Sequence, residues 1–148
     1  MFYTHFAASL FFILVFLSSV EHKLSFIFVV AIATLLPDID NPFSSIGKFK
    51  VPRFLQFFSK HRGFIHSFTF LLIACLILVL FIPIFVLPFF LGFSVHLLAD
   101  SFTKQGIMPF WPYKKTTSWR IKTGGVTETT LFVFLLLVDI IAVVVIAL

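Results

Sequence analysis

Apolar residues in this chain of 148 residues fall into four long runs that are separated by polar segments. The runs cover residues 2–20, 24–36, 64–99 and 130–148. A membrane-spanning helix needs roughly 20 predominantly apolar residues, so the third run is long enough for two such helices. Pro83 and Pro88 lie near the middle of that run, where they interrupt a helix most easily. The pattern therefore predicts five membrane-spanning helices, with the third and fourth antiparallel and joined near Ile82 and Pro83.

Polar segments connect the predicted spans in two different ways. Residues 21–23 form a tight turn, which makes a helical hairpin of the first two runs. Residues 38–63 and 101–127 form longer basic loops, and residues 52–60 within the first loop predict a short amphipathic helix at the membrane interface. The first run follows no basic region and ends in only a weak cleavage site, so we expect a retained span rather than a cleaved signal peptide.

Composition supports this architecture. Hydrophobic residues make up 60% of the chain and charged residues only 11%, and the mean hydropathy is +1.14. We therefore predict an all-α fold: a polytopic integral membrane bundle of about five transmembrane helices plus the short interfacial helix, as a single domain over residues 1–148. The single cysteine, Cys75, lies inside an apolar run and cannot form an intramolecular disulfide.

Basic residues orient the predicted bundle. Every Lys and Arg except Lys23 lies in one of the two long loops. Five spans place both loops on one side of the membrane, which the positive-inside rule assigns to the cytoplasm, whereas a single span in the third run would separate them. We therefore expect a multi-pass protein of the cell inner membrane with a cytoplasmic N-terminus and an external C-terminus. Topology accounts for the formal net charge of +5, so we expect no nucleic-acid partner.

Most histidines and acidic residues fall in four clusters at the ends of the apolar runs. The clusters are Pro37-Asp38-Ile39-Asp40, His61-Arg62-Gly63-Phe64-Ile65-His66-Ser67, His96-Leu97-Leu98-Ala99-Asp100 and Thr127-Glu128. The predicted topology brings them to the cytoplasmic face together with His5, and among the histidines it leaves only His22 on the other side. Ionisable groups at the edge of a bilayer are costly and usually functional. Imidazole and carboxylate together have the chemistry of a metal site.

Spacing favours ligand roles for two of these pairs. His96 and Asp100 are four residues apart and therefore share one helix face. An acid is badly placed at the negative end of a helix dipole, which favours a functional role over an accident of sequence. Asp38 and Asp40 repel each other unless a cation or an arginine neutralises them, although a turn with a helix cap also uses such residues.

The other candidates each have a functional and a structural interpretation. We expect His61 in the loop and His66 in the first helical turn, either as ligands or as interfacial side chains that reach toward water. Arg62 suits a phosphate or carboxylate partner, and Ser67 is a candidate hydrogen-bond partner for the site.

Three further residues belong to the apolar runs or border them. His5 is either a ligand or a structural histidine. Glu128 is equally credible as a ligand, a general base or a helix cap. Asp139 lies away from the predicted site, in the middle of the last run, and receives no chemical role.

The motifs resemble those of the YdjM-like family. The resemblance covers nearly the whole chain and rests on His5, on Leu36-Pro37-Asp38-Ile39-Asp40 with Ser45, and on the His61–Ser67 and His96–Asp100 motifs quoted above. That family is described as LexA-regulated, inner-membrane, metal-dependent hydrolases, grouped remotely with zinc-dependent phospholipases C and P1-type nucleases. The resemblance implies metal-dependent hydrolysis of a phosphoester.

We therefore expect a membrane-bound, metal-dependent hydrolase that acts on a lipid phosphate or phospholipid headgroup at the cytoplasmic face, with membrane lipids as its partners. Its cofactor would be a divalent metal, Zn²⁺ first, with Mn²⁺ or Mg²⁺ as alternatives. The core ligands would be Asp38, Asp40, His66, His96 and Asp100, and the further ligands His5, His61 and Glu128. The expected catalytic residues are Arg62, Glu128 and His61, with Lys104 as a second group to stabilise negative charge.

The alternative is a non-enzymatic membrane protein, such as a metal or ion transporter or a partner-binding subunit. A transporter should carry ionisable groups near the membrane midplane, whereas these residues gather at one face.

Overall fold

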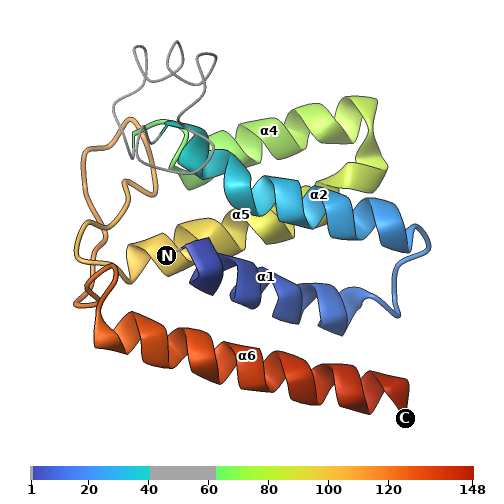
Figure 1. Cartoon of the computed structure of the whole chain (residues 1–148). Helices are drawn as coiled ribbons and strands as arrows, with labels where there is room; N and C mark the ends of the chain where they lie inside the picture. The colour runs from blue at the N-terminus through green and yellow to red at the C-terminus, as the bar shows by residue number, and fades with distance from the viewer. Residues whose placement is uncertain (1, 41–62) are drawn as a thin grey trace.

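The computed structural model describes residues 2–40 and 63–148, which form a bundle of helices (Figure 1). The α-helices are α1 (Phe2–Phe16), α2 (Lys23–Leu35), α4 (Phe68–Phe81), α5 (Val86–Ser101) and α6 (Val126–Ala147), and two short 3-10 helices are η1 (Leu36–Asp40) and η2 (Pro83–Phe85). The described residues contain no β-strand, only two isolated bridges in the segment between α5 and α6. The predicted all-α fold is confirmed for this part of the chain. The predicted interfacial helix, residues 52–60, lies outside the described residues.

The long third run divides where its prolines predicted. Helix α4 ends at Phe81, Ile82 is non-helical, and Pro83 is the first residue of η2. Proline suits a first helical position because that position needs no backbone N–H donor. Pro88 lies in the first turn of α5, where a missing N–H also breaks no helical hydrogen bond. The prediction of two helices joined near Ile82 and Pro83 is therefore confirmed.

Helix α5 is the centre of the bundle. Helices α1, α2 and α4 all pack against it, whereas α6 packs against α1 alone among the described helices. Helices α2 and α5 approach closely at Gly92, where an added Cβ would lie 2.3 Å from the carbonyl oxygen of Val30. Buried Ala33, Phe93 and Leu97 belong to the apolar core around this crossing.

The helices alternate in direction, and this sorts the polar segments to two ends. The start of α1, the end of α2, the start of α4, the end of α5 and the start of α6 lie at one end of the bundle (Figure 1). The α1–α2 turn with His22, the α4–α5 junction and the C-terminus lie at the other end. The candidate residues of η1, α5 and α6 therefore share one end with His5.

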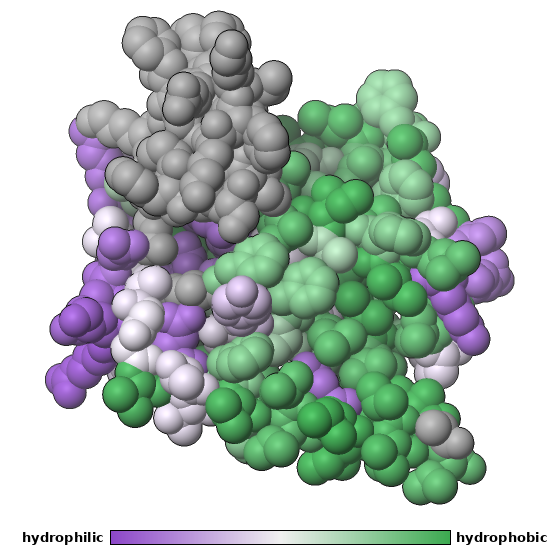
Figure 2. All heavy atoms as spheres, in the orientation of Figure 1, coloured by the Kyte–Doolittle hydropathy of each residue, from purple (hydrophilic) through white to green (hydrophobic). Residues whose placement is uncertain are grey.

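The surface between the two ends is apolar. Figure 2 shows a broad hydrophobic band over the helices with hydrophilic residues at both ends. Two segments, Pro83–Ser101 and Val126–Ile146, are long and apolar enough to cross a membrane, and α1 and α4 are shorter apolar helices. Helix α6 exposes most of its apolar side chains. Length and composition thus identify two membrane-capable helices among the five predicted spans.

Candidate metal centre

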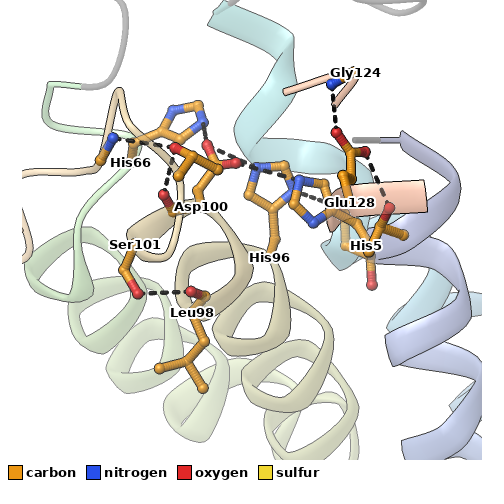
Figure 3. A network of polar contacts seen from close by, with 12 residues as sticks. His5, His66, His96, Leu98, Asp100, Ser101, Gly124 and Glu128 are labelled. Atoms are coloured by element: carbon orange, nitrogen blue, oxygen red, sulfur yellow. Dashed lines mark hydrogen bonds and ion pairs between the residues drawn. The ribbon is translucent and has the colours of Figure 1, made fainter. Parts of the chain in front are cut away.

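Three structural elements bring four ionisable side chains together at one end of the bundle (Figure 3). His96 and Asp100 lie on the last turns of α5, His5 on the first turn of α1, and His66 in the turn before α4. All four residues are buried, with at most 3% exposure. The imidazole ring of His96 lies between the other two, with centroid distances of 4.3 Å to His5 and 5.4 Å to His66.

Asp100 is the common neighbour of the three histidines. Its Oδ1 lies 3.3 Å from Nε2 of His5, and its Oδ2 lies 3.7 Å from Nε2 of His66 and 3.9 Å from Nε2 of His96. The predicted i, i+4 pair on α5 thus shares a helix face, as its spacing required.

Two overlapping groups have the arrangement of metal ligands. His5, His96 and Asp100 form one group, and Asp38, His66 and His96 form the other. Within each group every residue offers a ligand atom, and these atoms lie within 4.8 Å of one another. Nitrogen and carboxylate donors in this combination suit Zn²⁺, and also other first-row divalent ions.

The orientation of His96 fits a cation in particular. Its Nδ1 donates a hydrogen bond to the carbonyl oxygen of Thr34 at 2.7 Å, which leaves Nε2 as the acceptor nitrogen of the neutral ring. That Nε2 is buried, has no hydrogen-bond partner among the described residues, and faces the carboxylate of Asp100. Two acceptors that face each other in a buried site repel unless a proton or a cation lies between them. A backbone acceptor on the opposite ring nitrogen is typical of metal-ligating histidines.

Residues that the sequence analysis did not single out hold His96 in place. The Thr34 hydroxyl donates to Val30 O at 2.8 Å and accepts from Ser9 Oγ at 2.7 Å, so α1 and α2 are joined directly beneath the cluster. Gly92 provides the close approach that brings the Thr34 carbonyl to α5. The only sequence signal was the presence of small and polar residues inside apolar helices, where they favour close helix packing.

Glu128 lies beside the cluster but belongs to neither ligand group among the described residues. Its Oε1 accepts a hydrogen bond from Thr4 Oγ1 at 3.0 Å, and its Oε2 accepts from the backbone N–H of Gly124 at 2.7 Å. Gly124 has a φ of 74°, a conformation that favours glycine. These bonds connect the first turn of α6 to the residue before its N-cap, Gly125, and to the residue before His5 on α1.

His66 and Ser67 differ from their predicted placement. His66 precedes α4 instead of lying in its first turn, because Ser67 is the N-cap. The Ser67 hydroxyl accepts from the Phe70 N–H at 3.1 Å and donates to the Phe64 carbonyl at 2.6 Å. Both bonds join the Ser67 hydroxyl to backbone groups of the turn. Ser67 therefore positions His66 by fixing the main chain rather than by contacting its side chain.

The remaining predicted residues lie apart from the cluster or outside the description. The described part of the chain does not include Ser45, His61, Arg62 or the side chain of Asp40. Lys104 is exposed at the polar end. Asp139 is buried in α6, and neither of its carboxylate oxygens has a hydrogen-bond partner among the described residues.

Comparison with known proteins gives a family match over nearly the whole chain. The family described as YdjM inner membrane protein matches residues 1–147. The inner membrane proteins YdjM of Escherichia coli (strain K12) and of Shigella flexneri are each 37% identical to the chain over 102 residues, which is 60% of this chain and 47% of the relative. The chain thus spans about half the length of the curated relatives it matches. No solved structure gives a significant match.

Proposed function

The chain belongs to the YdjM inner membrane protein family, and from that premise we propose that it is a membrane-embedded, metal-dependent hydrolase of phosphoesters. The proposal includes a multi-pass bundle whose cluster of His5, Asp38, His66, His96 and Asp100 faces the cytoplasm, and a lipid phosphate as the substrate class. Ionisable side chains gathered at the edge of an apolar band seldom persist without a function.

One observation carries the proposal: three buried imidazoles converge on one buried carboxylate. The three Nε2 atoms lie 3.3 to 3.9 Å from the oxygens of Asp100. The helix packing that produces this arrangement leaves His96 Nε2 with no hydrogen-bond partner among the described residues. A divalent cation would be a partner for that nitrogen and would balance the charge of the carboxylate.

The chain's own residues divide the work at such a site. His5, Asp38, His66, His96 and Asp100 would hold the ion or ions. A bound Zn²⁺ would supply an activated water at neutral pH and polarise the phosphoryl oxygen.

Two contacts position these ligands before any substrate arrives. The carbonyl oxygen of Thr34 orients the ring of His96. Glu128 accepts a hydrogen bond from Thr4 and so holds the start of α1, which carries His5. Arg62 is the expected partner for the phosphate charge, since its planar guanidinium binds phosphate oxygens in pairs.

Metal analysis is the first test. The full chain, purified in detergent, should contain at least one divalent ion per molecule, and the Asp100→Asn variant should lose it. Asp139→Asn is the matched control, because it changes an equally buried acid that lies in the middle of α6, away from the cluster. Wild-type protein without stoichiometric metal would refute the metal-dependent mechanism.

Hydrolysis is the second test. Phospholipids and lipid pyrophosphates should be assayed with and without chelator, and we expect chelator-sensitive release of phosphate or of a phosphorylated headgroup from at least one class. Bound metal without hydrolysis of any lipid phosphoester would favour the alternative, a non-enzymatic metal transporter or partner-binding subunit.

A further inference from the structure

An apolar groove runs along α4 from the polar end of the bundle into the hydrophobic band. Its volume is about 450 Å³, and its lining exposes only apolar atoms. It exists because α2 and α4 both pack against α5 but not against each other. Leu36 and Phe64 line the end nearest the cluster, and Ile73, Ala74, Ile77 and Leu78 follow along α4. We call this space the α4 groove.

The chemistry of the lining selects the occupant. A peptide or a sugar brings backbone or hydroxyl groups that need hydrogen-bond partners, and this groove offers none from its lining. A hydrocarbon chain needs no such partners and can pack against the apolar side chains of the lining. The chain belongs to an inner membrane protein family, so its apolar surface lies among phospholipid acyl chains.

One end of the groove is lined by residues close in sequence to members of the candidate metal centre. Leu36 comes directly before Pro37-Asp38, and Phe64 comes two residues before His66. The Phe64 ring also contacts the rings of Phe70 and Trp111, with centroids 5.3 Å and 4.9 Å away. Trp111 is 41% exposed, and tryptophan favours the headgroup level of a membrane. A molecule whose tail lies in the groove therefore has its polar head at the level of Asp38 and His66.

We propose that the α4 groove binds one acyl chain of a membrane phospholipid and so presents the lipid phosphate to the His/Asp cluster. The inference about the phosphate rests on the proposed function, but binding of the acyl chain does not require hydrolysis. From Phe70 to Leu78 the helix rises about 12 Å, at roughly 1.5 Å per residue. The groove therefore holds the part of the chain closest to the headgroup, and Leu78 lies at its far end.

Two variants and a matched control separate groove binding from general contact with lipid. Ala74→Trp fills the middle of the groove, and Leu78→Trp shortens it from the far end. Leu76→Trp places the same bulk on the same helix, at a side chain that is 63% exposed and outside the groove lining. The surrounding lipid tails are as apolar as the groove, so Ala74→Trp should act by removing the space that the acyl chain occupies, whereas Leu76→Trp leaves that space unchanged.

The probe is phosphatidic acid with a photoactivatable diazirine in its acyl chain. The full chain is placed in phosphatidylcholine nanodiscs with a trace of the probe, and the labelled residues are mapped by mass spectrometry after illumination. We expect labels on Ile73 and Ile77, loss of these labels in Ala74→Trp and no change in Leu76→Trp. Leu78→Trp should lose labels from probes whose diazirine lies deep in the chain and keep those near the headgroup.

Several outcomes would overturn the proposal. Equal labelling of Leu72 and Leu76, unaffected by Ala74→Trp, would mean that only bulk lipid touches α4. Cross-links to a second copy of the chain would mean that the groove is a protein interface. If Ala74→Trp does not fold, Leu78→Trp carries the same comparison. The Asp100→Asn variant should keep its labels, because binding of the acyl chain does not require the metal. Specific labelling without any hydrolysis would therefore refute the proposed function alone. Hydrolysis with uniform labelling would refute the groove alone.

Discussion

Asp100 and Asp139 are equally buried, each with 2% exposure, yet their surroundings are opposite. Asp100 lies at the polar end of the bundle, with three imidazole nitrogens within 3.9 Å of its oxygens. Asp139 lies within α6, packed toward α1, and has no hydrogen-bond partner among the described residues. The burial of an acid in an apolar chain therefore does not by itself mark a site. A site requires that several elements direct polar atoms to the same point.

The difference follows from how the helices pack. Helix α5 is covered by α1, α2 and α4, so a residue at its end meets side chains from several directions. Helix α6 packs against α1 alone, and the rest of its surface is exposed apolar side chains. A carboxyl group in the middle of α6, unlike Glu128 at its start, thus has little opportunity to find a charged or polar partner.

Removing the carboxylate of Asp100 should have the largest effect. In Asp100→Asn the three histidines lose the negative charge that they share. Losing a residue that only orients a metal ligand lowers metal affinity by up to about a hundredfold, and we expect the loss of this carboxylate to cost at least as much. Elemental analysis and metal titration measure this loss. Retention of wild-type metal content by this variant would break the comparison, because Asp100 would then be no more functional than Asp139.

A methyl group at Gly92 should disturb the same cluster from a distance. In Gly92→Ala the new Cβ would lie 2.3 Å from the carbonyl oxygen of Val30, so α2 and α5 must separate and the bond from His96 to Thr34 must lengthen. We expect a loss of about 1–3 kcal/mol in the free energy of unfolding, together with weaker metal binding.

The control for this variant lies two residues away. Ser94→Ala, on the same helix, removes a buried hydroxyl that has no hydrogen-bond partner among the described residues, so it should leave metal binding unchanged and should not lower the free energy of unfolding. Thermal unfolding and metal titration of the two variants give the result, and equal behaviour of the pair would show that the α2–α5 crossing does not hold the site.

Glu128 should show a smaller effect, of a positioning kind. Gln has one carbonyl oxygen where Glu has two, so Glu128→Gln cannot accept from both Thr4 Oγ1 and the Gly124 N–H. One lost hydrogen bond to a charged group costs about 1.5–3 kcal/mol, and we expect a drop in metal affinity near the low end of 10–100-fold. Glu21→Gln, an exposed acid at the other end of the bundle, is the control. A complete loss of metal in Glu128→Gln would instead identify Glu128 as a ligand.

Most of the helical pattern could be predicted from hydropathy and proline positions, but the helix ends could not. Helix α1 stops at Phe16 although the apolar run continues to Val20. Ser18 and Ser19 lie in a turn there, and serine favours turns by bonding to its own backbone. Helix α6 begins at Val126, before the apolar run, and Glu128 in its first turn accepts a hydrogen bond from the N–H of Gly124. Hydropathy indicates which residues avoid water, whereas hydrogen bonding decides where a helix begins and ends.

The members of the cluster were accessible to sequence reasoning, whereas their support was not. The spacing of His96 and Asp100 places them on one helix face, and alternating helix directions bring His5 to the same end. The contact between His96 and Thr34 involves a backbone carbonyl, which any residue possesses, so no side-chain pattern could reveal it. It depends on the distance between two helices, which Gly92 sets through three-dimensional packing.

Replacing Asp139 should have the smallest effect and the opposite sign. A buried carboxyl without a hydrogen-bond partner costs free energy, so Asp139→Leu should leave metal content unchanged and raise the free energy of unfolding by up to about 1–3 kcal/mol. Asp139→Asn keeps the size and a polar group, so it should gain less than Asp139→Leu. Thermal unfolding in detergent, alongside metal analysis, compares the two variants with the wild type. A loss of stability or of metal in Asp139→Leu would mean that this acid has a partner in the membrane, and the contrast with Asp100 would then be one of partner rather than of function.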